Sequence, residues 1–245
     1  MKNYFLIITI FASILISCQG NKSEQKTDDS ESKAVCPTDV NDNLPMEITS
    51  FDTIKLLTPK TKFGKTLMEA MWLRKTSREY SEKMLSLRQL SDLMWVTNGI
   101  NRPDDATRNR TVPSAMAKYP IQTYAVLANG IYFYNPEQNL LIPYLEGDFR
   151  EQTGGQPFVG TAPLNIVLFA DYSVYEDPNR QMDDIKKLWF AALDAAHSCQ
   201  NIYLYCASEN LSTVERAMAP ENICEIFKLN ENHHFIIAQT VGFPK

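Results

Sequence analysis

The sequence predicts an α+β fold, in which helices pack on a central, mostly antiparallel sheet. Three observations support this prediction. Short apolar segments between residues 121 and 145 are separated by turn signals. The almost wholly apolar segment 164–170 is typical of a buried central strand. Helical patterns stand before and after these strands, at 67–98 and 181–208, and no internal repeat is present.

Two helices are expected before the first strand. The first covers 67–74, and the second begins where Ser86 and Gln89 have the spacing of a capping box. Asn98-Gly99 ends the second helix, and the polar stretch 101–110 has no apolar period, so it predicts a loop. The apolar residues spaced to share one face of a helix are Leu67, Met68, Met71 and Trp72 in the first and Leu87, Leu90, Leu93 and Met94 in the second.

The strands follow from apolar segments and their turns. Segment 121–128 is followed by Asn129-Gly130, which is a strong hairpin signal, and then by 131–134. Asn135-Pro136 turns the chain before 140–145.

The longest helix is expected over 181–208, and a terminal strand over 235–241. Small side chains dominate the apolar stripe of this helix, which favours close packing between helices. The stripe consists of Leu188, Ala191, Ala192, Ala195, Cys199, Ile202 and Cys206.

Composition excludes several classes of protein. The chain has 245 residues, 44% hydrophobic and 22% charged, which is typical of a globular protein and not of a disordered or collagen-like chain. A net charge of −5 and a pI near 5.3 argue against a nucleic-acid-binding surface. Small molecules or proteins are the expected partners.

The N-terminus predicts export. A positive start at Lys2 and an apolar segment over 4–17 form a signal peptide (residues 1–17), too short to span a bilayer. It ends in Leu-Ile-Ser-Cys, which resembles the lipobox of bacterial lipoproteins and implies lipidation at Cys18. An ordinary cleaved signal with an incidental cysteine is the alternative.

Residues 18–50 predict a flexible polar tether, and residues 51–245 predict the folded domain. Because Gln19 is not an aspartate, we expect the outer membrane of the cell envelope.

Several common chemistries are disfavoured. Cys199 and Cys206 lie about 10 Å apart along one helix, too far for a disulfide, and the cysteines and histidines lack the spacing of a metal site. His233 and His234 point to opposite faces of a strand. Ser114 with His197 or His233 lacks the surroundings of a hydrolase nucleophile.

Four segments carry candidate chemistry. Residues 74–78 (Arg-Lys-Thr-Ser-Arg) hold enough donors to bind a phosphate, although such a run can also be a solvated surface. Residues 113–120 form a loop between two prolines. Gln200-Asn201 predicts either a hydrogen bond between helices or the wall of a ligand slot. Residues 241–244 end a strand in a tight turn.

Together these segments resemble the FMN-dependent nitroreductase family over residues 64–244. The branch that includes azoline-oxidising dehydrogenases is the most similar, because its members carry an R-R-S-x-R opening and a P-S-A-x-x-x-Y-P loop. Trp95, Asn98-Gly99-Ile100, Gly154-Gly155-Gln156 and Ala162-Pro163 are also similar to the family.

The resemblance implies a homodimer with two FMN molecules at its interface, where the long helix also lies. It implies no catalytic amino acid and no metal, because the flavin carries the redox chemistry. Pro113, Ser114 and Ala115 would line the isoalloxazine from the partner chain. The other cofactor-binding residues that it implies are Arg74, Lys75, Thr76 and Arg78 for the phosphate and ribityl chain, Gln156 for the pyrimidine edge, and a turn at Val214 to Ala217 near N5.

Some positions depart from the family pattern. Residues 209–213 (Glu-Asn-Leu-Ser-Thr) replace a glycine-rich turn, Ala217 replaces a common glycine, and Ala117 replaces an asparagine. The basic C-terminal arm of many members is absent, and Lys245 is a possible substitute.

Two functions therefore remain open. One is an exported, lipid-anchored FMN oxidoreductase that reduces nitroaromatic or quinone-like acceptors, or dehydrogenates a small substrate. The other is a degenerate nitroreductase-fold lipoprotein that binds a ligand without turnover. Nicotinamide nucleotides are expected in the cytoplasm, so an exported enzyme would need another electron donor.

Overall fold

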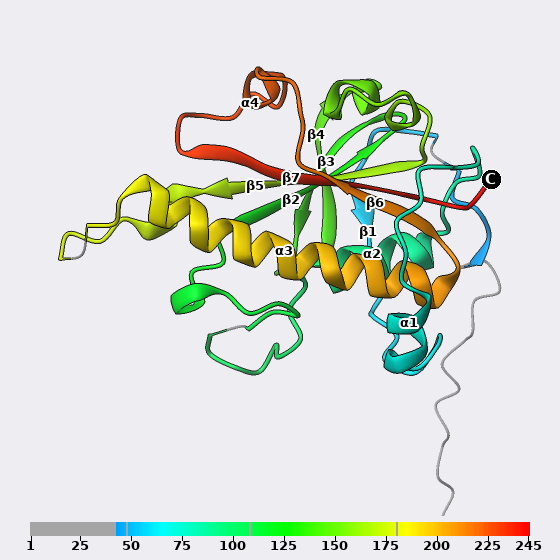
Figure 1. Cartoon of the computed structure of the whole chain (residues 1–245), viewed down its shortest axis with the longest axis horizontal. Helices are drawn as coiled ribbons and strands as arrows, with labels where there is room; N and C mark the ends of the chain where they lie inside the picture. The colour runs from blue at the N-terminus through cyan, green and yellow to red at the C-terminus, as the bar shows by residue number, and fades with distance from the viewer. Residues whose placement is uncertain (1–42, 48, 108, 180) are drawn as a thin grey trace, which may run out of the picture. The chain divides into compact units, whose positions relative to one another are not determined.

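A computed structural model of the chain describes residues 43–47, 49–107, 109–179 and 181–245, all within one compact unit, Asp39–Lys245. Its centre is a seven-stranded sheet in the order β1-β4-β3-β2-β5-β7-β6, and every neighbouring pair is antiparallel (Figure 1). Helices flank this sheet, which confirms the predicted α+β class.

The predicted strands and hairpins are present. Asn129-Gly130 joins the second and third strands, and the segment 164–170 forms an interior strand between two neighbours. The strands are β1 (Ile54–Lys55), β2 (Ile121–Leu127), β3 (Gly130–Asn135), β4 (Leu140–Glu146), β5 (Leu164–Asp171), β6 (Ser212–Arg216) and β7 (His233–Gly242).

Side chains cap the three longer helices. Thr66 and Ser86 each form a capping box with the residue three positions later, and Asp183 accepts a hydrogen bond from the Lys186 amide. The sequence analysis did not identify the cap at Asp183. The α-helices are α1 (Leu67–Leu73), α2 (Leu87–Asn98), α3 (Asp184–Glu209) and α4 (Ile223–Ile226), and the 3₁₀ turns are η2 (Ala115–Ala117), η3 (Arg150–Thr153), η4 (Pro157–Val159) and η5 (Tyr172–Tyr175).

Each face of the sheet has its own apolar core because side chains alternate along the strands. Ala125 and Leu127 of β2 join the core beneath α2 and α3. Tyr124 and Val126 join the core beneath α4, where Phe227 packs against Tyr124 and Phe169. The long helix α3 crosses the first face and also contacts α1 (Figure 1).

One expectation about turns was wrong: most of the predicted turn at Val214 to Ala217 is an edge strand, because residues 212–216 pair with β7. The predicted apolar face of α1 is exposed in the single chain: Trp72 is 89% and Met68 73% exposed, and only Ala70 is buried. Leu188 and Ala192 of the α3 stripe are also exposed, whereas the rest of the stripe is buried.

The signal peptide, Cys18 and most of the tether lie outside the described residues. Within the tether, the Met46 amide donates to the Leu85 carbonyl oxygen at 2.9 Å, so contacts with the domain begin before residue 51. None of the helices in the described segments has the length and apolarity to cross a bilayer.

Candidate functional site

The segment that follows α1 is fixed along the edge of the sheet. The Ser77 amide donates to the Thr213 carbonyl oxygen at 3.0 Å, and the Ser81 amide donates to the Phe243 carbonyl oxygen at 2.9 Å. Between them, the Tyr80 hydroxyl donates to the Ser77 carbonyl oxygen at 2.8 Å. The donor-rich residues 74–78 are therefore held beside β6.

Tyr203 on α3 positions two of the predicted phosphate-binding residues. Its hydroxyl lies 3.0 Å from the Thr76 hydroxyl and accepts a hydrogen bond from the Glu215 amide at 3.2 Å. The Arg74 guanidinium lies over the Tyr203 ring, 5.3 Å from its centroid. The sequence analysis did not identify this tyrosine.

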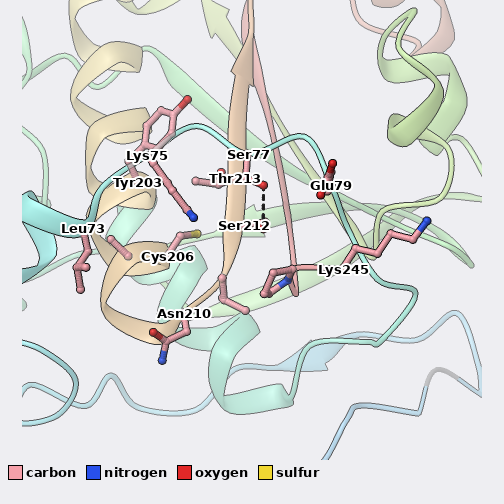
Figure 2. Close-up of a pocket in the computed structure, with 13 residues that line it drawn as sticks. Leu73, Lys75, Ser77, Glu79, Tyr203, Cys206, Asn210, Ser212, Thr213 and Lys245 are labelled. Atoms are coloured by element: carbon pink, nitrogen blue, oxygen red, sulfur yellow. Dashed lines mark hydrogen bonds between the residues drawn. The ribbon is translucent and has the colours of Figure 1, made fainter.

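A cavity of about 400 Å³ lies between α3, β6 and this segment (Figure 2). Lys75 points its ammonium into the cavity, and the Ser212 hydroxyl donates to the Ser77 hydroxyl at 3.2 Å. Lys245 also lines the cavity but extends away from Lys75, and Glu79 contributes a carboxylate. We call this space the lysine cavity; it is lined by Leu73, Lys75, Ser77, Glu79, Tyr203, Cys206, Ala207, Asn210, Leu211, Ser212, Thr213, Pro244 and Lys245.

A second cavity, of about 530 Å³, brings together four predicted site residues from three separate parts of the sequence. They are Arg78, Gln156, Val214 and Ala217. Its lining is mainly apolar, with the Gln156 amide and the Arg78 guanidinium among the few polar groups. We call it the arginine cavity; its remaining lining residues are Gly155, Glu215, Arg216, Met218, Ala219 and Pro220.

Arg216 is a buried cation in the wall of the arginine cavity. Its side chain reaches four acceptor atoms on three residues, Thr153, Asn165 and Thr240. Burial lowers the pKa of Arg216 to about 10, while the nearby Tyr80 acts to raise this pKa. Arg216 therefore remains charged at neutral pH. Sequence reasoning missed Arg216, because an arginine in a short polar segment gives no sign of burial.

The loop with Pro113, Ser114 and Ala115 lines neither cavity of the single chain. Ser114 donates to the buried carboxylate of Asp194, which also accepts from the Ala115 amide. Ser114 Oγ in turn accepts from the Tyr119 amide at 2.8 Å. Three non-glycine residues of this loop, Met116, Ala117 and Tyr119, have positive φ between 48° and 56°. The carboxylate on α3 therefore holds a strained loop.

The structure bears on two alternatives from the sequence. Asn201 Nδ2 donates to the Val96 carbonyl oxygen at 2.9 Å, so this polar residue makes a hydrogen bond between α3 and α2. It also lines a cavity of about 360 Å³. The Ser114 hydroxyl bonds to Asp194 and to the Tyr119 amide, which is not the nucleophile–histidine pairing of a Ser-His-Asp triad. Across the described segments, no cluster of three His, Cys, Asp or Glu side chains is placed to bind a metal.

Comparison with known proteins gives consistent results. The profile of the Nitroreductase family matches residues 73–243. A candidate nitroreductase from Methanocaldococcus jannaschii is 29% identical over 191 residues, which cover 74% of this chain and 92% of that protein.

Two solved structures extend this comparison. A candidate nitroreductase from Ralstonia eutropha JMP134 is 35% identical, with a TM-score of 0.73 over 83% of this chain and 94% of that one. A candidate nitroreductase from Desulfovibrio desulfuricans, solved in complex with FMN, is 17% identical, with a TM-score of 0.50 over 74% of this chain and 88% of that one.

Proposed function

The chain belongs to the nitroreductase family, and from that premise we propose that it is an FMN-dependent oxidoreductase. One observation carries the proposal: Arg78, Gln156, Val214 and Ala217, which the family resemblance assigns to the cofactor, line a single cavity. The FMN bound by the D. desulfuricans relative supports the choice of cofactor.

The donors at the two cavities fit a phosphorylated, polyhydroxy ligand. Lys75 supplies a cation inside the lysine cavity, and the Ser77 and Ser212 hydroxyls can exchange their mutual hydrogen bond for bonds to a ligand. Arg78, which follows Ser77 in the sequence and lines the arginine cavity, supplies a planar guanidinium that suits a phosphate. The carboxylate of Glu79 partly offsets the positive charge that Lys75 and Lys245 bring to the lysine cavity.

The arginine cavity fits the ring of the same ligand. Its apolar lining excludes water from a flat aromatic system, and Gln156 offers both a donor and an acceptor to a pyrimidine edge. When bound, FMN supplies the redox chemistry. The task of the chain is to hold the phosphate, orient the ring and set the charge beside it.

We propose that two copies of the chain form the complete site. Apolar side chains are exposed on α1 and on the N-terminal half of α3, which is typical of surfaces that bind a partner. A second copy would cover them and bring its own Pro113, Ser114 and Ala115 to the cofactor. The exposed side chains are Leu67, Met68, Met71, Trp72 and Leu73 on α1 and Ile185, Leu188, Trp189 and Leu193 on α3.

We further propose that the enzyme is anchored at the bacterial cell envelope through a lipid on Cys18, with the outer membrane favoured. Its acceptors would be nitroaromatic or quinone-like compounds, or its donor a small substrate that becomes dehydrogenated. The expected change on Cys18→Ser is transfer of the protein from the membrane fraction to the aqueous fraction of the cell extract.

The visible spectrum of the purified full-length protein, with and without added FMN, tests the cofactor assignment. A yellow protein that releases FMN on denaturation would support the oxidoreductase. A colourless protein whose spectrum and fluorescence do not change with FMN would overturn it and favour a binding lipoprotein without turnover.

A further inference from the structure

Arg216 is a buried charge without a carboxylate partner. The residue is 6% exposed and lies on the edge strand β6. Its Nε donates to Thr240 Oγ1 at 3.0 Å, its Nη1 to the Thr153 carbonyl oxygen at 2.8 Å, and its Nη2 to Asn165 Oδ1 at 3.1 Å. Nη2 also lies 3.5 Å from Thr153 Oγ1. All of these acceptors are neutral, and no ion pair of Arg216 exists among the described residues.

Burying an unpaired ion is unfavourable, because the charge loses its solvation by water and gains no opposite charge in return. Arg88 shows the usual solution: it is 8% exposed, and Nη1 lies 3.0 Å from Asp92 Oδ1. Arg216 carries the same cost of burial without this compensation. A negatively charged ligand beside it would supply the missing counter-charge.

Arg216 lies in the wall of the cavity where such a ligand would bind. Arg216 lines the arginine cavity together with Arg78, and the other charged residue there is Glu215, whose side chain is exposed. The fixed charge at this cavity is therefore net positive, and its buried part is wholly positive. Neutral acceptors orient Arg216 without cancelling its charge, so its field acts on whatever occupies the cavity.

We propose that Arg216 tunes the bound cofactor: it holds reduced FMN more tightly than oxidised FMN and so raises the midpoint potential. This inference rests on the proposed function. Uptake of two electrons and one proton from the external donor gives the ring one more negative charge than it has when oxidised. A buried cation beside the ring stabilises the more negative form, and low local dielectric strengthens this effect.

Two substitutions remove the positive charge by different routes. Arg216→Gln deletes it, and Asn165→Asp keeps the guanidinium but places a carboxylate where it now donates to an amide oxygen. Each is expected to weaken the preference for reduced over oxidised FMN at least tenfold, which lowers the two-electron midpoint potential by about 30 mV or more. Arg216→Lys keeps the charge and is expected to stay close to the wild-type potential.

Arg150→Gln is the matched control. Arg150 also donates to a backbone carbonyl, that of Ala162 at 3.1 Å, but it pairs with Asp148 and does not line the cavity. Its loss changes the packing near η3 without changing the charge beside the cofactor, so the potential should not move. Because Asn165→Asp retains the guanidinium, a failure of Arg216→Gln to fold still leaves a measurement.

Spectroelectrochemical titration of full-length protein loaded with FMN gives the decisive result. A lower potential in Arg216→Gln and Asn165→Asp, with Arg216→Lys and Arg150→Gln unchanged, supports the proposal. Binding of FMN with one unchanged potential in all variants overturns it and leaves the oxidoreductase intact. Failure of the wild-type protein to bind FMN overturns the proposed function, and this inference with it.

Discussion

Gly154 lies so close to the Arg216 guanidinium that a Cβ on this glycine would overlap Nη1. The backbone of Gly154 is extended, with φ 172°, so the requirement for glycine comes from the contact and not from the backbone conformation. The neighbouring Gly155 is open, with nothing within 4 Å of an added Cβ. Residue 154 therefore has to be a glycine, because any larger side chain would collide with the buried guanidinium of Arg216.

Gly154→Ala is expected to lower the free energy of unfolding by about 1–3 kcal/mol, because it overpacks a site whose neighbours are tied by hydrogen bonds. Gly155→Ala is the control and should change stability by less than about 0.5 kcal/mol. Urea denaturation measures both. Equal stability of the two variants would contradict the tight contact.

Arg74→Ala combined with Arg78→Ala is expected to abolish retention of FMN. Loss of a charge-assisted hydrogen bond costs about 1.5–3 kcal/mol, so each substitution weakens binding roughly 10- to 150-fold. Flavin content after gel filtration measures the effect. Arg102→Ala is the control and should retain the cofactor, because Arg102 lines neither cavity and its Nε donates to the adjacent Asn101. Undiminished FMN in the double variant would refute the assigned phosphate site.

Trp72→Glu and Trp189→Glu are expected to produce monomers, because each places a charge on an exposed apolar face assigned to the second copy. Trp72 is 89% and Trp189 64% exposed, so neither substitution disturbs the core of the single chain. Substitution of a central aromatic residue in an interface typically costs 2 kcal/mol or more. Sedimentation velocity measures the species present. Leu44→Glu, at a position 57% exposed and outside both faces, is the control. A stable dimer in both tryptophan variants would contradict the interface.

Asp194 should make stability depend on pH in the direction opposite to that of an ion-paired carboxylate. Burial raises the pKa of Asp194, against the lowering effects of Ser114, Ala115 and His197, so the native state binds this proton more tightly than the unfolded state. Its contribution is therefore present at low pH and is lost as the pH rises through the raised pKa.

Relative to Asp194→Asn, the wild-type protein should lose free energy of unfolding as the pH rises from the ordinary aspartate range, about pH 4, through the raised pKa of Asp194, since asparagine does not titrate. Urea titrations at four pH values measure this difference. A difference that stays constant, or that grows in favour of the wild type as the pH rises, would contradict the raised pKa. Asp184→Asn, at an exposed position in the first turn of α3, is the control.

Local signals made most of the fold predictable. The capping box at Ser86 and the Asn129-Gly130 turn act through neighbouring residues, so the sequence alone places the α2 start and the β2–β3 hairpin. Strand β6 gave no such signal: its residues are largely polar, and their extended form depends on pairing with β7, which begins well after β6 ends. Periodicity likewise identified the apolar face of α1 but not what covers it.

The sequence likewise predicted only part of the candidate site. Motif resemblance assigned Arg78, Gln156 and Ala217 to the cofactor, because each belongs to a short segment with its own pattern, and all three line one cavity. Arg216 and Tyr203 could not be found in this way. Their roles depend on acceptors and neighbours brought together only by folding, such as Thr153 and Thr240 around the buried guanidinium.

Helix α3 carries both Tyr203, which holds Arg74 and Thr76, and Asp194, which holds Ser114. About 14 Å of continuous helix separates these two residues. In a dimer built as proposed, Tyr203 serves the cofactor of its own subunit, whereas Asp194 serves that of the other. One helix of each subunit would therefore make contacts at both redox centres of the proposed dimer. A substitution that displaces α3 would then disturb both centres at once, although each of its two contacts serves only one of them.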